Sequence, residues 1–111
     1  MSRVYVVKEP RRRNRETGEW ELAYDLSPAA EFGELVFLLP PGYTAIDGGT
    51  FPDLRRRLNG FSDDDYRLPM GDPAHIARAA IAAAGMNGGR LRLLQWDRLT
   101  REYIVKALLT R

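Results

Sequence analysis

Apolar and polar residues alternate along this 111-residue chain in blocks that predict strands near both ends and helices between them. Residues 4–7 form a β-branched and aromatic run that is typical of a strand. Residues 20–26 carry apolar side chains at every second position, which is the period of a half-buried strand. We expect these two segments to pair as a hairpin with a long basic tip.

Three further segments are rich in apolar residues. Residues 34–39 are apolar almost throughout, which indicates the most buried and central strand of a sheet. Residues 90–96 and 103–109 predict a second hairpin at the end of the chain. The short segment 66–68 is expected to be only an extended link.

Two helices are expected between these strands, after a single helical turn that begins at Ser27-Pro28. The first opens at Pro52 and turns its apolar positions toward the core, namely Leu54, Leu58 and Phe61. The second begins at Asp72-Pro73, a good cap followed by a proline suited to a first helical position. It ends before the Asn-Gly-Gly at 87–89.

The longer helix has two predicted faces. Its core stripe is expected to contain Ile76, Ala77, Ala80, Ile81 and Ala84, while the wetter stripe contains His75, Arg78 and Ala82. Strands thus come first and last, with helices between them. The order predicts one globular α+β domain over residues 1–111, with a five-stranded, mainly antiparallel sheet and two helices packed on one face.

Composition narrows the classes of protein. The chain has no cysteine, so disulfides, thiolate metal ligands and thiol nucleophiles are excluded. No apolar stretch approaches the roughly 18 residues of a membrane span, and the first residues do not match a signal peptide. We therefore expect a cytoplasmic protein that does not contact membranes.

Charge is unevenly distributed along the chain. Residues 1–20 carry six basic and three acidic groups, whereas residues 21–54 carry six acidic groups and no basic one. Clustered arginines on a β-ribbon suit a phosphate backbone, and a tryptophan at its base suits stacking on an unpaired base. A GC-rich genome also produces arginine-rich proteins, so composition alone does not decide between these explanations. The predicted nucleic-acid contacts, to DNA or RNA, are Arg11, Arg12, Arg13, Arg15, Trp20, Arg90, Arg92, Arg98 and Arg101.

A second candidate site lies at the start of the longer helix. Asp72, His75 and Arg78 surround backbone N–H groups that favour anions. The alternative is an ordinary exposed helix start, because Asp72 already caps those groups. The pair Gly48-Gly49 could let a backbone approach a ligand, although such a pair is more often a turn.

Three consecutive aspartates, residues 63–65, resemble a metal or acid–base site at first sight. A calcium loop needs glycine at its sixth position and glutamate at its twelfth, where this chain has Leu68 and Ala74. Ser62 and Asp65 have the spacing of a capping box, which favours a capped turn. We therefore expect no metal, no cofactor and no catalytic residue.

Three stretches carry a resemblance to a known group of proteins: GELVFLLPPG (33–42), FSDDDYRLPMGDPAHIA (61–77) and GGRLRLLQWDRLTREY (88–103). Together they resemble small uncharacterised proteins encoded by bacteriophages, prophages and plasmids. The resemblance covers nearly the whole chain and implies a mobile genetic element in a bacterium. It supplies no functional residues.

These observations favour a non-enzymatic accessory protein of a phage or mobile element that binds nucleic acid through its arginine-rich hairpin. The alternative is a protein-interaction module, a homo-oligomer or one that pairs through an edge strand. An enzyme with a site between residues 63 and 78 is the third hypothesis.

Overall fold

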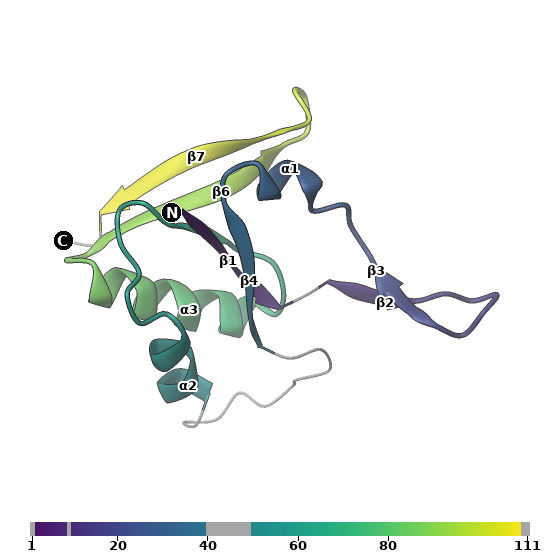
Figure 1. Cartoon of the computed structure of the whole chain (residues 1–111), viewed down its shortest axis with the longest axis horizontal. Coiled ribbons are helices and arrows are strands. Elements are labelled where there is room, and N and C mark those ends of the chain that lie inside the picture. The colour runs from purple at the N-terminus through teal and green to yellow at the C-terminus, as the bar shows by residue number, and fades with distance from the viewer. Residues whose placement is uncertain (1, 9, 40–49, 110–111) are drawn as a thin grey trace.

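A computed structural model describes residues 2–8, 10–39 and 50–109 (Figure 1). The Gly48-Gly49 pair lies outside the described residues. In chain order the elements are β1 (Arg3–Lys8), β2 (Arg11–Arg13), β3 (Trp20–Leu22), α1 (Ser27–Ala30), β4 (Glu34–Leu39), α2 (Thr50–Arg57), β5 (Tyr66–Leu68), α3 (Pro73–Met86), β6 (Arg90–Asp97) and β7 (Glu102–Leu109).

Five strands form one sheet in the order β4-β1-β5-β6-β7, and β2 pairs with β3 in a separate small sheet. The α+β class and the five-stranded sheet are therefore confirmed. The expected mainly antiparallel pairing is wrong. The first four strands of the sheet are mutually parallel, and only β6 and β7 form an antiparallel pair. The reason is that a helix lies in each connection between these strands, with α1 between β1 and β4, α2 between β4 and β5, and α3 between β5 and β6. Such crossover connections return the chain to the same end of the sheet and so make the strands parallel.

Two strands differ from their predicted roles. β4 is an edge strand, although its apolar run predicted a central one. A parallel strand that is covered on both faces is apolar throughout, whether it lies at the centre or at an edge of the sheet. The apolar segment of β4 therefore did not show which of these two places the strand takes. β5 was expected to be a link, yet it lies between β1 and β6.

The predicted first hairpin is also wrong in its pairing. β3 pairs with β2 rather than with β1, and together they form an arm that extends from the body (Figure 1). Trp20, expected to be half buried, is 64% exposed. The apolar positions of β3 therefore lie on an exposed face of the ribbon, which they share with arginines of β2.

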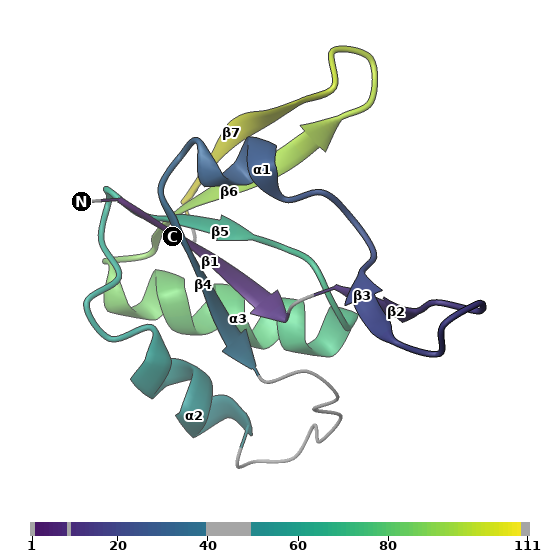
Figure 2. The same cartoon turned by 45° about the vertical axis from the view of Figure 1, so that its right-hand side comes forward.

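The sheet has a hydrophobic cluster on each face. Side chains alternate along β1, so Tyr5 and Val7 point one way and Val4 and Val6 the other. Tyr5 and Val7 pack in a cluster with α2 and α3 residues, while Val4 and Val6 pack with Ala29 of α1. Figure 2 shows α2 and α3 on one side of the sheet and α1 on the other.

α3 begins and ends as predicted. The Asp72 carboxylate accepts a hydrogen bond from Ala74 N at 2.9 Å, and Pro73 is the first helical residue. At the other end, Gly88 has φ +64° and Gly89 N donates to Ala84 O at 2.8 Å. This bond satisfies a carbonyl of the last turn.

The core stripe of α3 was predicted only in part. Ala84 is buried and Ile76 and Ala80 pack against the hydrophobic cluster, as predicted. Ala77 is exposed instead of buried, and the wetter stripe was wrong at His75 and Ala82. The buried side chains are those of His75, Ala79, Ala82, Ala83 and Ala84. Ile81, placed in the core by the pattern, is 62% exposed. Alanine occupies so many positions of this helix that its apolar stripe has no sharp edge, so the pattern did not determine which side of the helix faces the sheet.

No helix in the described ranges is long and apolar enough to cross a membrane.

Candidate nucleic-acid interface

The arm formed by β2 and β3 has two different faces. Arg13 pairs with Trp20 in the ladder and Arg12 pairs with Glu21. Because side chains alternate along each strand, Arg11 and Arg13 share a face with Trp20. On the opposite face, Arg12 Nε lies 3.3 Å from Glu21 Oε1. One face thus combines two arginines with an exposed indole, and the other holds an ion pair.

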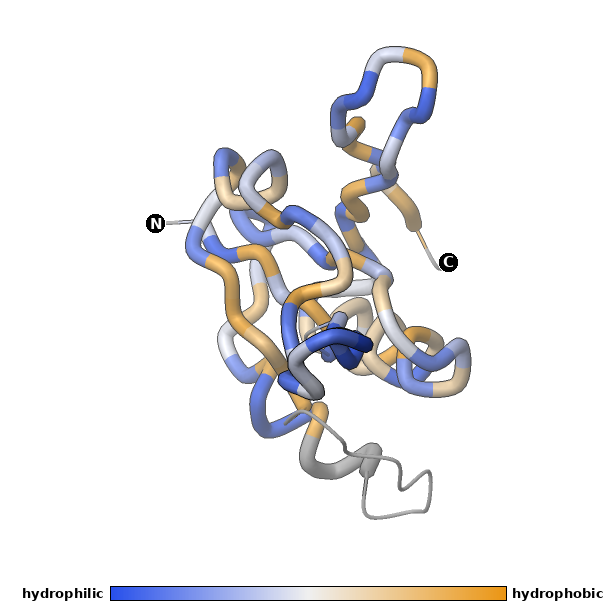
Figure 3. Tube along the Cα trace, turned by 90° about the vertical axis from the view of Figure 1, so that its right-hand side faces the viewer, coloured by the Kyte–Doolittle hydropathy of each residue, from blue (hydrophilic) through white to orange (hydrophobic). Residues whose placement is uncertain are grey.

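The turn at the end of the arm is held by its own hydrogen bonds. Asn14 Oδ1 accepts from Glu16 N at 2.8 Å and from Thr17 N at 3.2 Å. Arg13 Nε donates to Gly18 O at 3.2 Å, and Gly18 has φ +73°. In Figure 3 the arm faces the viewer and much of its trace is hydrophilic. These bonds give the arm a defined shape in addition to its charge.

The charge of the arm is more balanced than its arginines suggest. Over residues 11–22, four arginines are accompanied by three glutamates, Glu16, Glu19 and Glu21. The net charge of this segment is therefore only +1. Any affinity for phosphate must come from the separation of charges between the two faces rather than from the total.

A groove lined by aromatic side chains includes Tyr24, which follows β3 at the base of the arm. It has a volume of about 510 Å³ and is lined by Tyr24, Asp25, Pro28, Met70, Trp96, Arg98 and Tyr103. Trp96 and Tyr103 are partners in the β6–β7 ladder, and their rings meet edge to face at 67° with centroids 5.0 Å apart. Tyr24 is 62% exposed and Trp96 is 43% exposed, so both rings are accessible.

Two polar groups of the groove have shifted pKa values. Asp25 accepts hydrogen bonds from the hydroxyl and the backbone N of Ser27, at 2.7 and 2.9 Å, and these lower the pKa of its carboxyl. Burial, together with the charge of Asp25, raises the pKa of Tyr103. At neutral pH the groove therefore offers a carboxylate acceptor, a phenol hydroxyl and the guanidinium of Arg98 beside its aromatic rings.

The arginines of the C-terminal hairpin do not form one patch. Arg98 lines the aromatic groove, and Arg101 lines a neighbouring hollow of about 360 Å³ that also includes Tyr103. At the other end of β6, Arg90 Nε lies 3.0 Å from Asp63 Oδ1. The guanidinium of Arg92 lies 4.0 Å from the ring centroid of Tyr66. Only Arg98 and Arg101 are therefore placed near the aromatic groove.

The residues of the predicted anion site at the start of α3 are separated by burial. His75, expected on the wetter stripe, is 1% exposed and faces the core with Ala79 and Ala82. Arg78 is partly exposed. Asp72 is exposed and its carboxylate already accepts from Ala74 N. The rotation of α3 thus removes His75 from the surface where it was expected.

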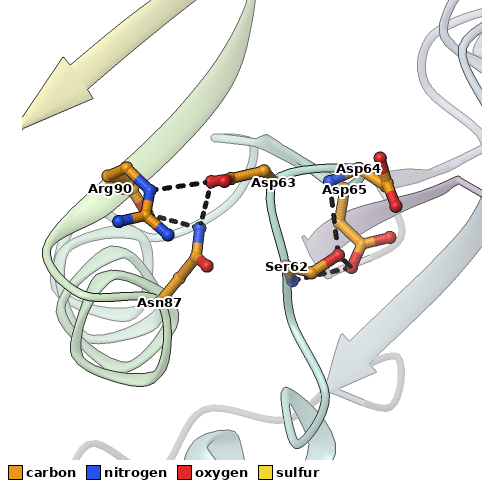
Figure 4. Close-up of polar contacts among 6 residues, drawn as sticks. All are labelled: Ser62, Asp63, Asp64, Asp65, Asn87 and Arg90. Carbon is orange, nitrogen blue, oxygen red and sulfur yellow. Dashed lines mark hydrogen bonds and ion pairs between the residues drawn. The ribbon is translucent and has the colours of Figure 1, made fainter.

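The three aspartates point in different directions (Figure 4). Asp63 accepts from Asn87 Nδ2 at 2.8 Å and from Arg90 Nε at 3.0 Å, and these bonds lower the pKa of its carboxyl. Asp65 is buried and accepts from Ser62 N, as the capping-box spacing predicted. In the described part of the chain, no group of three acidic or histidine side chains could hold a metal ion.

Sequence reasoning identified the cluster of arginines on the arm but not the pairing of the arm, and it missed the aromatic groove. Tyr24, Asp25, Trp96 and Tyr103 come from two distant segments, and none belongs to a local motif. One signal was available. The symmetric hairpin around residues 97–102 places Trp96 opposite Tyr103, which predicts a paired aromatic site next to Arg98.

Comparison with known proteins defines the class as a small phage-associated protein. The profile of the phage Pam3 gp32-like protein family matches residues 2–108, so the chain belongs to that family. The sequence resemblance to phage proteins is thereby confirmed. No curated protein and no solved structure matches the chain.

Proposed function

We propose that this protein is a non-enzymatic phage accessory protein that binds single-stranded nucleic acid. The arm contacts the phosphate backbone through the face that carries Arg11 and Arg13, and a base enters the aromatic groove. The observation that carries the proposal is that Arg11 and Arg13 lie on the same face of the arm as the exposed indole of Trp20.

The chemistry of each part suits a nucleic acid. Guanidinium groups bind phosphate oxygens in pairs, and a protruding ribbon can follow a backbone. Stacking a base on an aromatic side chain contributes about 1–3 kcal/mol and tolerates every base. Trp20 on the arm, with Tyr24 and Trp96 in the groove, supplies such surfaces.

The groove adds polar groups that single-stranded nucleic acid can use. The Asp25 carboxylate can accept from the amino group of a base, while Arg98 can donate to a phosphate. A base inside a duplex keeps its faces stacked on its neighbours. The groove therefore favours single strands over duplexes.

The experiment that tests this proposal measures the binding of labelled oligonucleotides by fluorescence anisotropy between about 50 and about 200 mM salt. We expect binding to single strands that weakens steeply with salt. Replacing Arg11 and Arg13 by alanine should weaken it several-fold and reduce the salt slope by roughly 0.7 for each phosphate that the protein no longer neutralises.

Arg12→Ala is the matched control, because Arg12 is on the opposite face and is paired with Glu21. It should change affinity much less than the loss of Arg11 and Arg13. If single strands do not bind even at low salt, or if all three arginines contribute equally, the proposed face is wrong.

The second candidate function is self-association through β7. This strand lies at one edge of the described sheet, and Val105, Leu108 and Leu109 on it are exposed. Such an edge can pair with the same edge of a second copy. Light scattering would then give a dimer whose stability is insensitive to salt, and Val105→Lys would dissociate it. A monomer at all concentrations would remove this candidate.

A further inference from the structure

Arg67 is a guanidinium buried at the centre of the sheet. It is the middle residue of β5, which lies between β1 and β6, and it is 0% exposed. Its register partner on β1 is Tyr5. Residues paired in register share a face of the sheet, so Arg67 projects toward the side covered by α2 and α3.

Two of the three guanidinium nitrogens of Arg67 have no hydrogen-bond partner among the described residues. Nη1 donates to Tyr5 O. Nε and Nη2 have no hydrogen-bond partner among the residues that the structure describes. Burial lowers the pKa of Arg67 to about 10, so the group still carries its charge at neutral pH.

The two unused groups form the side edge of the guanidinium. Nε–H and Nη2–H point in nearly the same direction, with a spacing that matches two oxygens on one carbon or phosphorus. A buried cation without a counter-charge destabilises the folded chain, and buried polar groups are almost always satisfied. Retaining Arg67 in the core is explained if an anion completes its bonding.

The topology independently marks this position. From the carboxyl end of β1 the chain leads to β4 on one side, and from the carboxyl end of β5 it leads to β6 on the other side (Figure 2). In open parallel sheets, ligands bind outside the carboxyl ends of two adjacent strands when the chain leaves these strands toward opposite sides of the sheet. In this sheet β1 and β5 are such a pair. Arg67 is one residue from the carboxyl end of β5.

We propose that Arg67 binds an oxyanion, a phosphate or a carboxylate, through Nε and Nη2. This site is separate from the arm and the aromatic groove, so it does not depend on the proposed binding of nucleic acid. The anion neutralises the buried charge and stabilises the fold in proportion to the logarithm of its concentration above the dissociation constant.

The test is thermal unfolding of the full chain in chloride, phosphate and acetate buffers of equal pH and ionic strength. We expect the melting temperature to rise with phosphate or acetate concentration relative to chloride. A rise with phosphate alone assigns a phosphate group, and a rise with acetate assigns a carboxylate. No rise with either anion overturns the proposal.

Arg67→Met and Arg67→Lys identify the residue responsible. Methionine removes the unpaired charge, so this variant should unfold at the same temperature as the wild type or higher in chloride and should lose the anion effect. Lysine keeps the positive charge but lacks the two parallel N–H donors of the guanidinium, so this variant should lose most of the anion effect. It provides a second measurement if the methionine variant does not fold. Arg55→Ala, at an exposed position of α2, should retain the anion effect. An anion effect that survives both Arg67 variants would contradict the assignment.

Discussion

Trp96 and Tyr103 meet edge to face across β6 and β7, with ring centroids 5.0 Å apart, and together form one wall of the aromatic groove. The only other tryptophan of the chain is Trp20, on the arm. The two indoles therefore report separately on the two parts of the proposed interface.

Single-tryptophan variants should distinguish the groove from the arm. In Trp20→Phe, the remaining indole is Trp96, and adding single-stranded oligonucleotide should quench its fluorescence because a base stacks in the groove. In Trp96→Phe, quenching should come from Trp20. If the oligonucleotide binds but leaves the emission of Trp96 unchanged, the groove does not take a base and only the arm is involved.

Much of the secondary structure could be predicted because strong local signals fix it. Asp72-Pro73 and the glycines at 88 and 89 determine both ends of α3, and two apolar-rich segments joined by a short polar turn predict the β6–β7 pair. β5 could not be predicted in this way. Its three residues have a buried arginine at their centre, and such a residue is normally exposed.

Strand pairing and the groove depend on tertiary packing that local patterns do not encode. Residues 4–7 and 20–26 both have strand character, but nothing in either segment specifies the other as its partner. The groove is lined from distant segments by Tyr24, Met70 and Trp96. The arginines of the arm could be identified because they are consecutive in sequence, whereas residues joined only by the fold could not.

Replacing Asp65 should destabilise the protein even though the two aspartates before it are exposed. Its carboxylate accepts from Arg3 N and Ser62 N, both at 3.0 Å, and so ties the start of β1 to the turn before β5. Asp65→Ala leaves these donors without their acceptor, and we expect a loss of about 1–3 kcal/mol in chemical denaturation. Asp64→Ala, at an exposed position, is the control and should be close to neutral. Equal effects would contradict this role.

Two glycines should respond in opposite ways to alanine. At Gly33 a Cβ atom would lie 2.5 Å from Ser2 O and 2.7 Å from Ser2 C, which are backbone atoms next to β1. Gly33→Ala should therefore cost about 1–3 kcal/mol, because overpacking pushes β4 away from β1. At Gly85 in α3 nothing lies within 4 Å of the added atom. Gly85→Ala should stabilise the helix by about 0.5–1 kcal/mol in the same denaturation assay.

The ion pair between Asp63 and Arg90 should make stability depend on acid pH. Hydrogen bonds from Arg90 and Asn87 hold the pKa of Asp63 below its ordinary value. The ionised carboxylate of Asp63 therefore adds its full contribution to the free energy of unfolding above the ordinary pKa of about 3.9. This contribution is lost as the pH falls through the lower pKa of the folded state. Wild type should be more stable than Asp63→Asn near neutral pH, and the difference should vanish in strong acid. Urea denaturation at a series of pH values measures it, with Asp64→Asn as the control. A difference that is constant down to about pH 2 would show that the charge of Asp63 contributes nothing to stability.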